Sequence, residues 1–227
     1  MILRFARWLL NALFGLLTTR RVEGLENIPS EPPYILATNH LSFFDVPWVV
    51  SVLGAEGKTA WVAEKYERHP FFGPIVRLGD PIFIQRGEVD REALQAAVEA
   101  LRSGRVFAIA PEGTRSKTGG LMRGKSGCAY LAQQSGAPIL PVAITGTEDL
   151  GRRLLRLRRP VVTLRVGRPF RLEPLTAEAR IDGVRQQADE VMCRIAALLP
   201  ARYRGVYADH PRLKRLLDAD RKNSGGQ

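Results

Sequence analysis

Residues 34–45 read YILATNHLSFFD, an apolar run followed at once by a polar segment that contains a histidine. Short apolar runs of this kind are typical of strands that are buried on both faces. In open α/β sheets, the residues that follow such a strand lie at its carboxyl end, where these proteins hold their ligands. We therefore expect residues 39–45 to belong to a functional site.

Similar apolar runs recur along the chain and alternate with helical patterns. The predicted strands are 34–38, 59–63, 81–84, 106–110, 139–144 and 161–166. An apolar repeat at helical spacing over 94–101, closed by Gly104, predicts a helix, and 177–199 is typical of a long second one. This alternation predicts a single α/β domain with a central, mostly parallel or mixed sheet flanked by helices.

Composition agrees with a compact domain and indicates anionic partners. The chain has 227 residues, 45% of them hydrophobic and 25% charged. Its formal net charge is +11, with 28 arginines and 6 lysines. The planar guanidinium of arginine suits phosphate groups, so the candidate partners are lipid headgroups, phosphorylated substrates and nucleic acids. The two cysteines, Cys128 and Cys193, have no metal-ligand spacing and fit a reducing compartment.

The first 19 residues predict an amphipathic helix. Polar or small residues recur every three or four positions, at Arg4, Arg7, Asn11, Gly15 and Thr18. The rest of the helix would be a wide apolar face, suited to lie in a membrane interface with the polar stripe among the headgroups. Its uncharged run is shorter than the about 20 residues that span a bilayer. The alternatives are a signal peptide and a helix packed on the protein's own core.

His40 and Asp45 are the first candidate catalytic residues. An imidazole accepts a proton near neutral pH, and a carboxylate bonded to its far nitrogen fixes the tautomer and stabilises the imidazolium. The nucleophile would then be a hydroxyl of the substrate. The alternative is a structural histidine beside a helix-capping aspartate.

The segment 111–116, PEGTRS, follows the strand at 106–110 and suits a phosphate site. Gly113 lets the backbone approach an anion, Arg115 can make paired hydrogen bonds to it, and Glu112 can orient a cation or a hydroxyl. Arg86, at the end of another strand, would bring a second guanidinium. An ordinary turn with a surface ion pair is the alternative.

Two other motifs are excluded. Residues 119–126, GGLMRGKS, match the pattern of a nucleotide-binding P-loop, but they do not start directly after a buried strand as a P-loop does. The chain also has no GxSxG elbow, which argues against a serine hydrolase.

Four ordered blocks together resemble the family of 1-acyl-sn-glycerol-3-phosphate acyltransferases. They are NHLSFFD at 39–45, DPIFIQR at 80–86, PEGTRS at 111–116 and APILPVAI at 137–144. The resemblance implies that His40 is the general base and that Asp45 orients it. It also implies an acceptor-phosphate site, to which we assign Arg86, Glu112, Gly113, Thr114, Arg115 and, nearby, Lys125.

The same resemblance implies the reaction and its partners. The acyl donor would be acyl-CoA or acyl carrier protein, the acceptor a lysophospholipid, and neither a metal nor a redox cofactor would be needed. We expect peripheral or monotopic attachment at the cytoplasmic face of an anionic membrane. The expected organisation is a membrane-associating helix and lead-in at 1–30, an acyltransferase domain at 31–205 and a basic C-terminal tail at 206–227.

Three alternatives remain open: another lipid acceptor, a non-catalytic membrane lipid-binding protein, and a nucleic-acid binder that uses the arginines of GRRLLRLRRP at 151–160. We do not expect nucleic acid as a partner, because this segment has no interleaved aromatic residues for base stacking. Its leucines, Leu154, Leu155 and Leu157, fit a membrane edge at least as well.

Overall fold

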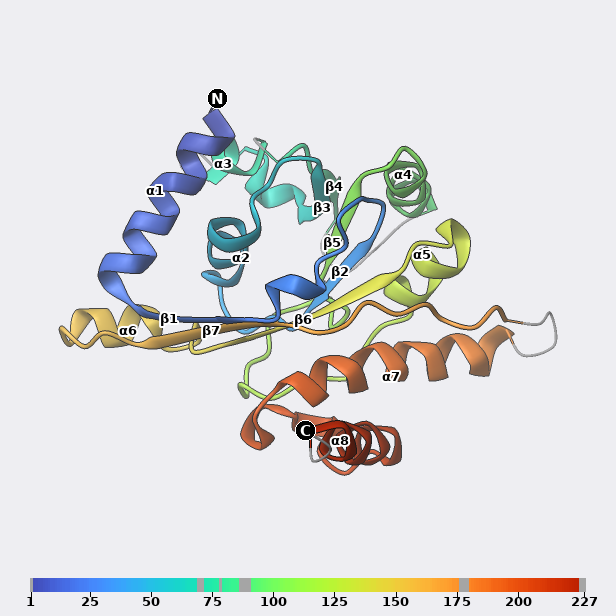
Figure 1. Cartoon of the computed structure of the whole chain (residues 1–227). Coiled ribbons are helices and arrows are strands. Elements are labelled where there is room, and N and C mark those ends of the chain that lie inside the picture. Colours follow the sequence, from blue (N-terminus) through green and yellow to red (C-terminus); the bar gives the residue numbers. More distant parts are fainter. Residues whose placement is uncertain (1, 69–71, 78, 86–90, 176–179, 225–227) are drawn as a thin grey trace.

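The computed structural model describes residues 2–68, 72–77, 79–85, 91–175 and 180–224 (Figure 1). Within these residues seven strands form one mixed sheet in the order β1-β7-β6-β2-β5-β3-β4. Their bounds are β1 Thr19–Glu23, β2 Ile35–Thr38, β3 Lys58–Ala63, β4 Ile82–Ile84, β5 Val106–Ile109, β6 Ile139–Thr145 and β7 Val161–Val166. Only the β6–β7 pairing is antiparallel in this described sheet.

Helices cover both faces of the sheet. Their bounds are α1 Ile2–Leu17, α2 Asp45–Leu53, α3 Phe72–Arg77, α4 Arg91–Arg102, α5 Gly127–Ser135, α6 Leu150–Leu155, α7 Arg180–Leu198 and α8 Pro211–Ser224. Short 3-10 turns occupy Leu25–Asn27, Glu64–Tyr66, Ala201–Tyr203 and Gly205–Tyr207. One core cluster joins α1 and α2 to the sheet, and a second joins α4, α5, α7 and α8 to the other face. Figure 1 shows α1 and α2 on one side of the sheet and α7 and α8 on the other.

The central strand β2 is apolar because both of its faces are buried. Ile35 and Ala37 enter the core under α5 and α7, whereas Leu36, between them, enters the core under α2. Successive side chains of a strand point to opposite faces, so a strand covered on both faces has to be apolar throughout. β2 pairs in parallel with β5 and β6, which brings the carboxyl ends of three strands to one edge of the sheet.

The predicted fold class is confirmed, with differences at its edges. All six predicted strands are present, and α4 covers the predicted helix at 94–101. The long helix begins at Arg180, and 177–179 lie outside the described residues. The strand β1 was not predicted, because TRRVE has no apolar run. The side chains of β4 and most of those of β3 are only partly buried, so the expectation that the strands are buried is wrong for these two.

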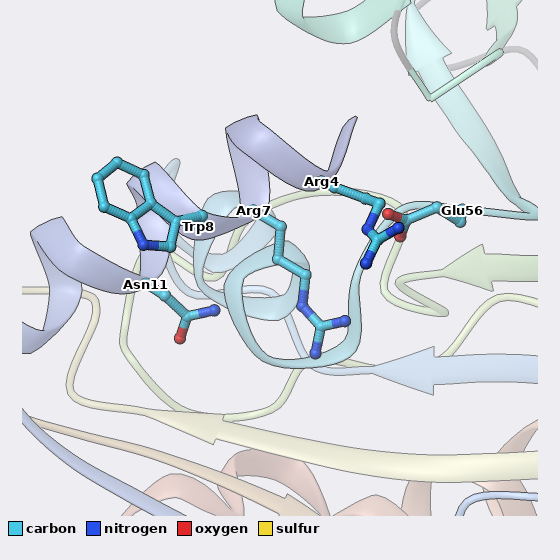
Figure 2. A pocket seen from close by; sticks show the side chains of 5 residues that line it. All are labelled: Arg4, Arg7, Trp8, Asn11 and Glu56. Carbon is cyan, nitrogen blue, oxygen red and sulfur yellow. The ribbon is translucent and has the colours of Figure 1, made fainter. Parts of the chain in front are cut away.

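The helix α1 packs with the opposite face from the one that the polar stripe predicted. Arg7 donates to the carbonyls of Ser51 and Val52, near the carboxyl end of α2, and Asn11 also donates to Ser51. Unpaired carbonyls at a helix end attract cations and donors, so these contacts are favourable. The expectation that Arg7 and Asn11 lie among headgroups is therefore wrong. Figure 2 shows Arg7 and Asn11 pointing from α1 toward α2, where they line a hollow of about 670 Å³.

The outer face of α1 is apolar and exposed. Phe14 is the exception among the predicted membrane-facing residues, because it is buried and packs on Trp48 with ring centroids 5.0 Å apart. The outer face consists of Ile2, Phe5, Trp8, Leu9, Leu13, Leu16 and Leu17, which are between 39% and 72% exposed. Over the part of the chain that the structure describes, every helix is too short or too polar to span a bilayer.

The predicted division at residues 30 and 205 stays a prediction. Both flanking segments contact the central sheet or its helices. β1 pairs in parallel with β7 over Thr19–Glu23, and Tyr207 and Leu213 belong to the core under α7.

Candidate active site

The candidate site lies where β2, β5 and β6 end side by side. The segment after β2 carries Asn39 and His40, the segment after β5 carries Glu112, and the segment after β6 carries Thr147. Three segments that are far apart in sequence thus meet because their strands are parallel neighbours.

His40 and Asp45 are in direct contact. The His40 Nδ1 atom lies 2.7 Å from Asp45 Oδ2. The Asp45 side chain is 3% exposed, while that of His40 is 26% exposed. Asp45 is the first residue of α2. The turn 40–45 that leads into this helix places its carboxylate next to His40. The imidazole therefore has one buried, bonded side and one side that reaches solvent.

The surroundings of Asp45 fix the tautomer of His40. Asp45 Oδ2 also accepts hydrogen bonds from the backbone N–H groups of Leu41, at 2.6 Å, and Ser42, at 2.9 Å. Thr147 donates its hydroxyl to the other oxygen, Oδ1. Backbone N–H groups can only donate, so Oδ2 faces His40 as a hydrogen-bond acceptor. His40 Nδ1 then carries the proton, so the lone pair of Nε2 is free to accept one.

Two residues of this network had little or no local signal. Thr147 is 102 positions from Asp45 and becomes its partner only through the pairing of β2 with β6. Asn39, 1% exposed, bonds the backbone of Ile144 through both its amide nitrogen and its carbonyl oxygen. It thereby ties the segment that carries His40 to β6. Asn39 lies inside the NHLSFFD block, but its partner is identified only by the fold.

Glu112 has contacts that differ from its predicted place beside a phosphate. It is 2% exposed, and its two oxygens accept from the backbone N–H groups of His40, at 3.0 Å, and Met122, at 2.8 Å. Burial raises the pKa of the Glu112 carboxyl, although these two hydrogen bonds act in the opposite direction. Both oxygens of Glu112 are therefore engaged, and they connect the segment of His40 to that of Met122. The contacts therefore favour a positioning role for Glu112 over direct contact with the substrate.

The segment 111–125, here called the 111–125 loop, carries the predicted cations among its exposed residues. Gly113 has a φ of 70°, in the left-handed region that favours glycine, and a Cβ added there would lie 3.0 Å from Lys125 Cδ. Thr114, Arg115 and Lys125 are exposed, and within the described chain Arg115 has no ion-pair partner. Gly113 and Lys125 are thus brought together. Arg86 lies outside the described residues.

Contacts with the histidine segment and with the C-terminal turns hold this loop. The backbone N–H of Ser116 donates to the His40 carbonyl at 2.8 Å. Gly124 donates its N–H to the Tyr207 hydroxyl at 3.0 Å, and that hydroxyl donates to Asp189. The backbones of Leu121 and Tyr203 are also bonded. The loop is therefore fixed to His40 at one end and to the turns at 201–207 at the other.

The two cysteine thiols are unsuited to nucleophilic chemistry. Both are buried, and burial raises the pKa of Cys128 and of Cys193 to about 12. A thiol with such a pKa is not a thiolate near neutral pH.

The fold and these contacts define a single α/β domain with a His–Asp pair and an arginine-bearing loop at one edge of its sheet. The family model described as Acyltransferase matches residues 19–145. The chain belongs to this acyltransferase family.

Relatives with related names share this region. The 1-acyl-sn-glycerol-3-phosphate acyltransferase of Saccharomyces cerevisiae is 30% identical over 169 residues, which cover 70% of this chain and 54% of that protein. The enzyme of the same name from Pseudomonas aeruginosa is 33% identical over 143 residues, covering 62% and 54%. The chain thus spans about half the length of the curated relatives it matches. The crystal structure of the 1-acyl-sn-glycerophosphate acyltransferase PlsC from Thermotoga maritima matches with a TM-score of 0.66 and 28% identity, covering 84% of this chain and 76% of that one.

Proposed function

We propose that this chain transfers a fatty acyl group from acyl-CoA or acyl carrier protein to the free hydroxyl of 1-acylglycerol 3-phosphate, which gives phosphatidic acid. The observation that carries this proposal is the His40–Asp45 contact, which leaves Nε2 of a partly exposed imidazole free to accept a proton. The names of the relatives support the choice of acceptor.

The reaction needs no covalent enzyme intermediate. His40 Nε2 removes the proton of the acceptor hydroxyl, and the oxygen attacks the thioester carbonyl. Asp45, held by four donors, stabilises the imidazolium that forms. The tetrahedral intermediate then collapses, the carbon–sulfur bond breaks, and the imidazolium returns its proton to the leaving thiolate. We propose that neither a metal nor a redox cofactor takes part, because side chains supply the base and the cations.

The acceptor phosphate would bind to the exposed cations of the 111–125 loop. Arg115 offers a planar pair of donors and Lys125 a point charge, while Gly113 leaves the backbone open. Arg86 is assigned to the same phosphate from the sequence alone. Beside His40, Phe43 is 37% and Val46 63% exposed, which supplies apolar surface for an acyl chain.

We also propose that the protein binds peripherally to the cytoplasmic face of an anionic membrane. The outer face of α1 supplies the apolar contact, and Phe5 and Trp8, with ring centroids 5.9 Å apart, form its widest aromatic surface. The excess of basic residues supplies attraction to anionic lipids.

The test is a direct assay of the purified chain. Lysophosphatidate is supplied with either acyl-CoA or acyl carrier protein carrying the same acyl group, and phosphatidate is measured. Lysophosphatidylcholine, whose phosphate carries an added choline, serves as the comparison acceptor. We expect phosphatidate from at least one donor and much slower acylation of lysophosphatidylcholine. A folded protein that forms no phosphatidate with either donor would contradict the proposal.

A further inference from the structure

The last residue of α6 and the turn that follows it expose two leucines to solvent. Leu155 is 88% exposed and Leu157 is 96% exposed. Leu157 has a φ of 53°, a left-handed conformation that a leucine rarely adopts. Backbone hydrogen bonds hold the turn: Leu157 donates its N–H to the carbonyl of Leu154, and Arg158 donates to that of Arg153. The exposure of these leucines is thus built into a bonded turn.

Arginines surround the two leucines. Those at 152, 153, 156 and 158 are all exposed. Within the described part of the chain, Arg152 of this group forms an ion pair with Asp149, 3.6 Å away, and both side chains are exposed. We call the segment 152–158 the α6 tip. Exposed apolar side chains within a cluster of cations complement a surface that is itself apolar inside and anionic outside.

The α6 tip is attached both to α1 and to the active site. Just beyond it, Arg159 donates to the carbonyls of Gly15 and Thr18 at the carboxyl end of α1. β1 follows α1 and β7 follows the tip, and the first residues of these two strands, Thr19 and Val161, are paired. On the other side, Thr147, which bonds Asp45, shortly precedes α6. Figure 1 shows α1 and α6 on the same side of the molecule, away from α8.

We propose that the α6 tip is a second membrane contact, in which Leu155 and Leu157 enter the acyl boundary of an anionic bilayer and the surrounding arginines bind lipid phosphates. This inference extends the peripheral attachment proposed above, but binding itself does not depend on acyl transfer. A helix lying in an interface fixes the protein along one line only. A second contact beyond the end of α1 prevents rotation about that line, and so sets how the His40 edge of the sheet faces the lipid.

The experiment measures sedimentation of the full chain with large vesicles, either zwitterionic or containing anionic lipid, at low and high salt. One variant combines Leu155→Ser with Leu157→Ser. A second replaces arginines 152, 153, 156 and 158 by glutamine. Matched controls are Leu25→Ser, an exposed leucine elsewhere, and the replacement of Lys214, Arg215, Arg221 and Lys222 by glutamine on α8, which removes the same number of charges.

We expect the leucine variant to lose about tenfold or more in partitioning at both salt concentrations, because it removes two apolar insertions. The arginine variant should lose about fivefold per engaged arginine on anionic vesicles at low salt, and little at high salt. Both controls should bind like the parent chain. Equal losses in the α8 control would overturn the proposal, since they would show that only net charge matters.

Measurements of melting temperature and of acyl transfer separate a loss of membrane binding from misfolding and from a failure of the proposed function. Leu157→Gly suits the left-handed backbone, so it should leave the melting temperature unchanged or raised and still weaken vesicle binding. Acyl transfer to a short-chain, monomeric acceptor should persist in the tip variants and fall only on acceptor embedded in vesicles. A chain without any transferase activity that still shows these binding losses would refute the proposed function and not the tip. Folded tip variants that bind vesicles like the parent chain would refute the proposed membrane contact. The same holds if these variants lose RNA binding but keep vesicle binding.

Discussion

Thr147 and Asp45 lie 102 positions apart in the chain, yet the threonine hydroxyl donates to Asp45 Oδ1 and completes the set of donors around the carboxylate that faces His40. The His–Asp pair therefore depends on the end of β6 as well as on its own turn. This dependence leads to a graded set of variants.

Removing the imidazole should slow transfer severely. His40→Ala is expected to lower kcat by about 10²–10⁴-fold, the usual contribution of a positioned base. Asp45→Asn should also be severely impaired, because asparagine offers one carbonyl oxygen where Asp45 uses two. Thr147→Val removes a single donor, so its effect should be smaller than that of Asp45→Asn. Steady-state kinetics with melting curves checks this order, and near-normal turnover in folded His40→Ala would exclude the general-base role.

Arg115 and Lys125 should affect the acceptor more than the donor. We expect Arg115→Ala to raise the KM for lysophosphatidate by about 10–100-fold, the range of a lost charged hydrogen bond, with a smaller change for the thioester. Arg115→Lys should recover only part, since a point charge lacks paired geometry. Arg215→Ala, on α8, is the control. Equal changes in KM for both substrates would count against a phosphate site.

Tyr207 should act through the loop that it holds. Tyr207→Phe removes the hydroxyl that accepts from Gly124 and donates to Asp189, which should lower the free energy of unfolding by about 1–3 kcal/mol. We also expect a higher KM for the acceptor, because the cations of the 111–125 loop lose their fixed position. Tyr130→Phe, on an exposed tyrosine, should change neither quantity. If Tyr207→Phe changes stability alone, the loop does not depend on this contact.

Glu190 predicts a pH dependence of stability. Burial raises the pKa of Glu190, but the hydrogen bonds from Arg212 and Arg194 outweigh it, so the pKa lies below its ordinary value of 4.5. A lowered folded-state pKa adds stability above the unfolded-state value, and this is lost as the pH falls through the folded-state value. Glu190→Gln should therefore cost about 1–2 kcal/mol at pH 7 and progressively less below pH 4.5. Denaturant titrations across the acid range would measure it, and a cost independent of pH would rule it out.

Mutations on the two faces of α1 should have different effects. Phe14→Ala should destabilise the fold by about 3–5 kcal/mol, because the ring is buried against Trp48. Trp8→Ser lies on the exposed outer face, so it should leave the melting temperature nearly unchanged and weaken vesicle binding. Calorimetry and vesicle sedimentation report the two effects independently. Loss of stability in Trp8→Ser would mean that the outer face belongs to the core.

The sequence predicted those features that depend on neighbouring residues. Each interior strand required its own apolar run, and the turn 40–45 is short enough for its pattern to predict the His–Asp contact. Periodicity also predicted that α1 has two faces. It could not predict which face packs inward, because the partners of Arg7 are carbonyls of α2, whose position is set by tertiary structure. The role of Thr147 and the backbone partners of Glu112 could not be predicted either, because tertiary structure brings them together.

The contacts between the 111–125 loop and the turns at 201–207 also bear on biosynthesis. Gly124 and its partner Tyr207 are 83 positions apart. A ribosome releases the chain from its amino end, so β2, with His40 and Asp45, leaves the exit tunnel long before Tyr207 is translated. The nascent chain thus acquires its candidate base well before the partner that fixes its candidate anion site. We expect a stalled chain that ends before residue 201 to lack the proposed activity, which would delay acyl transfer until this later part has been translated.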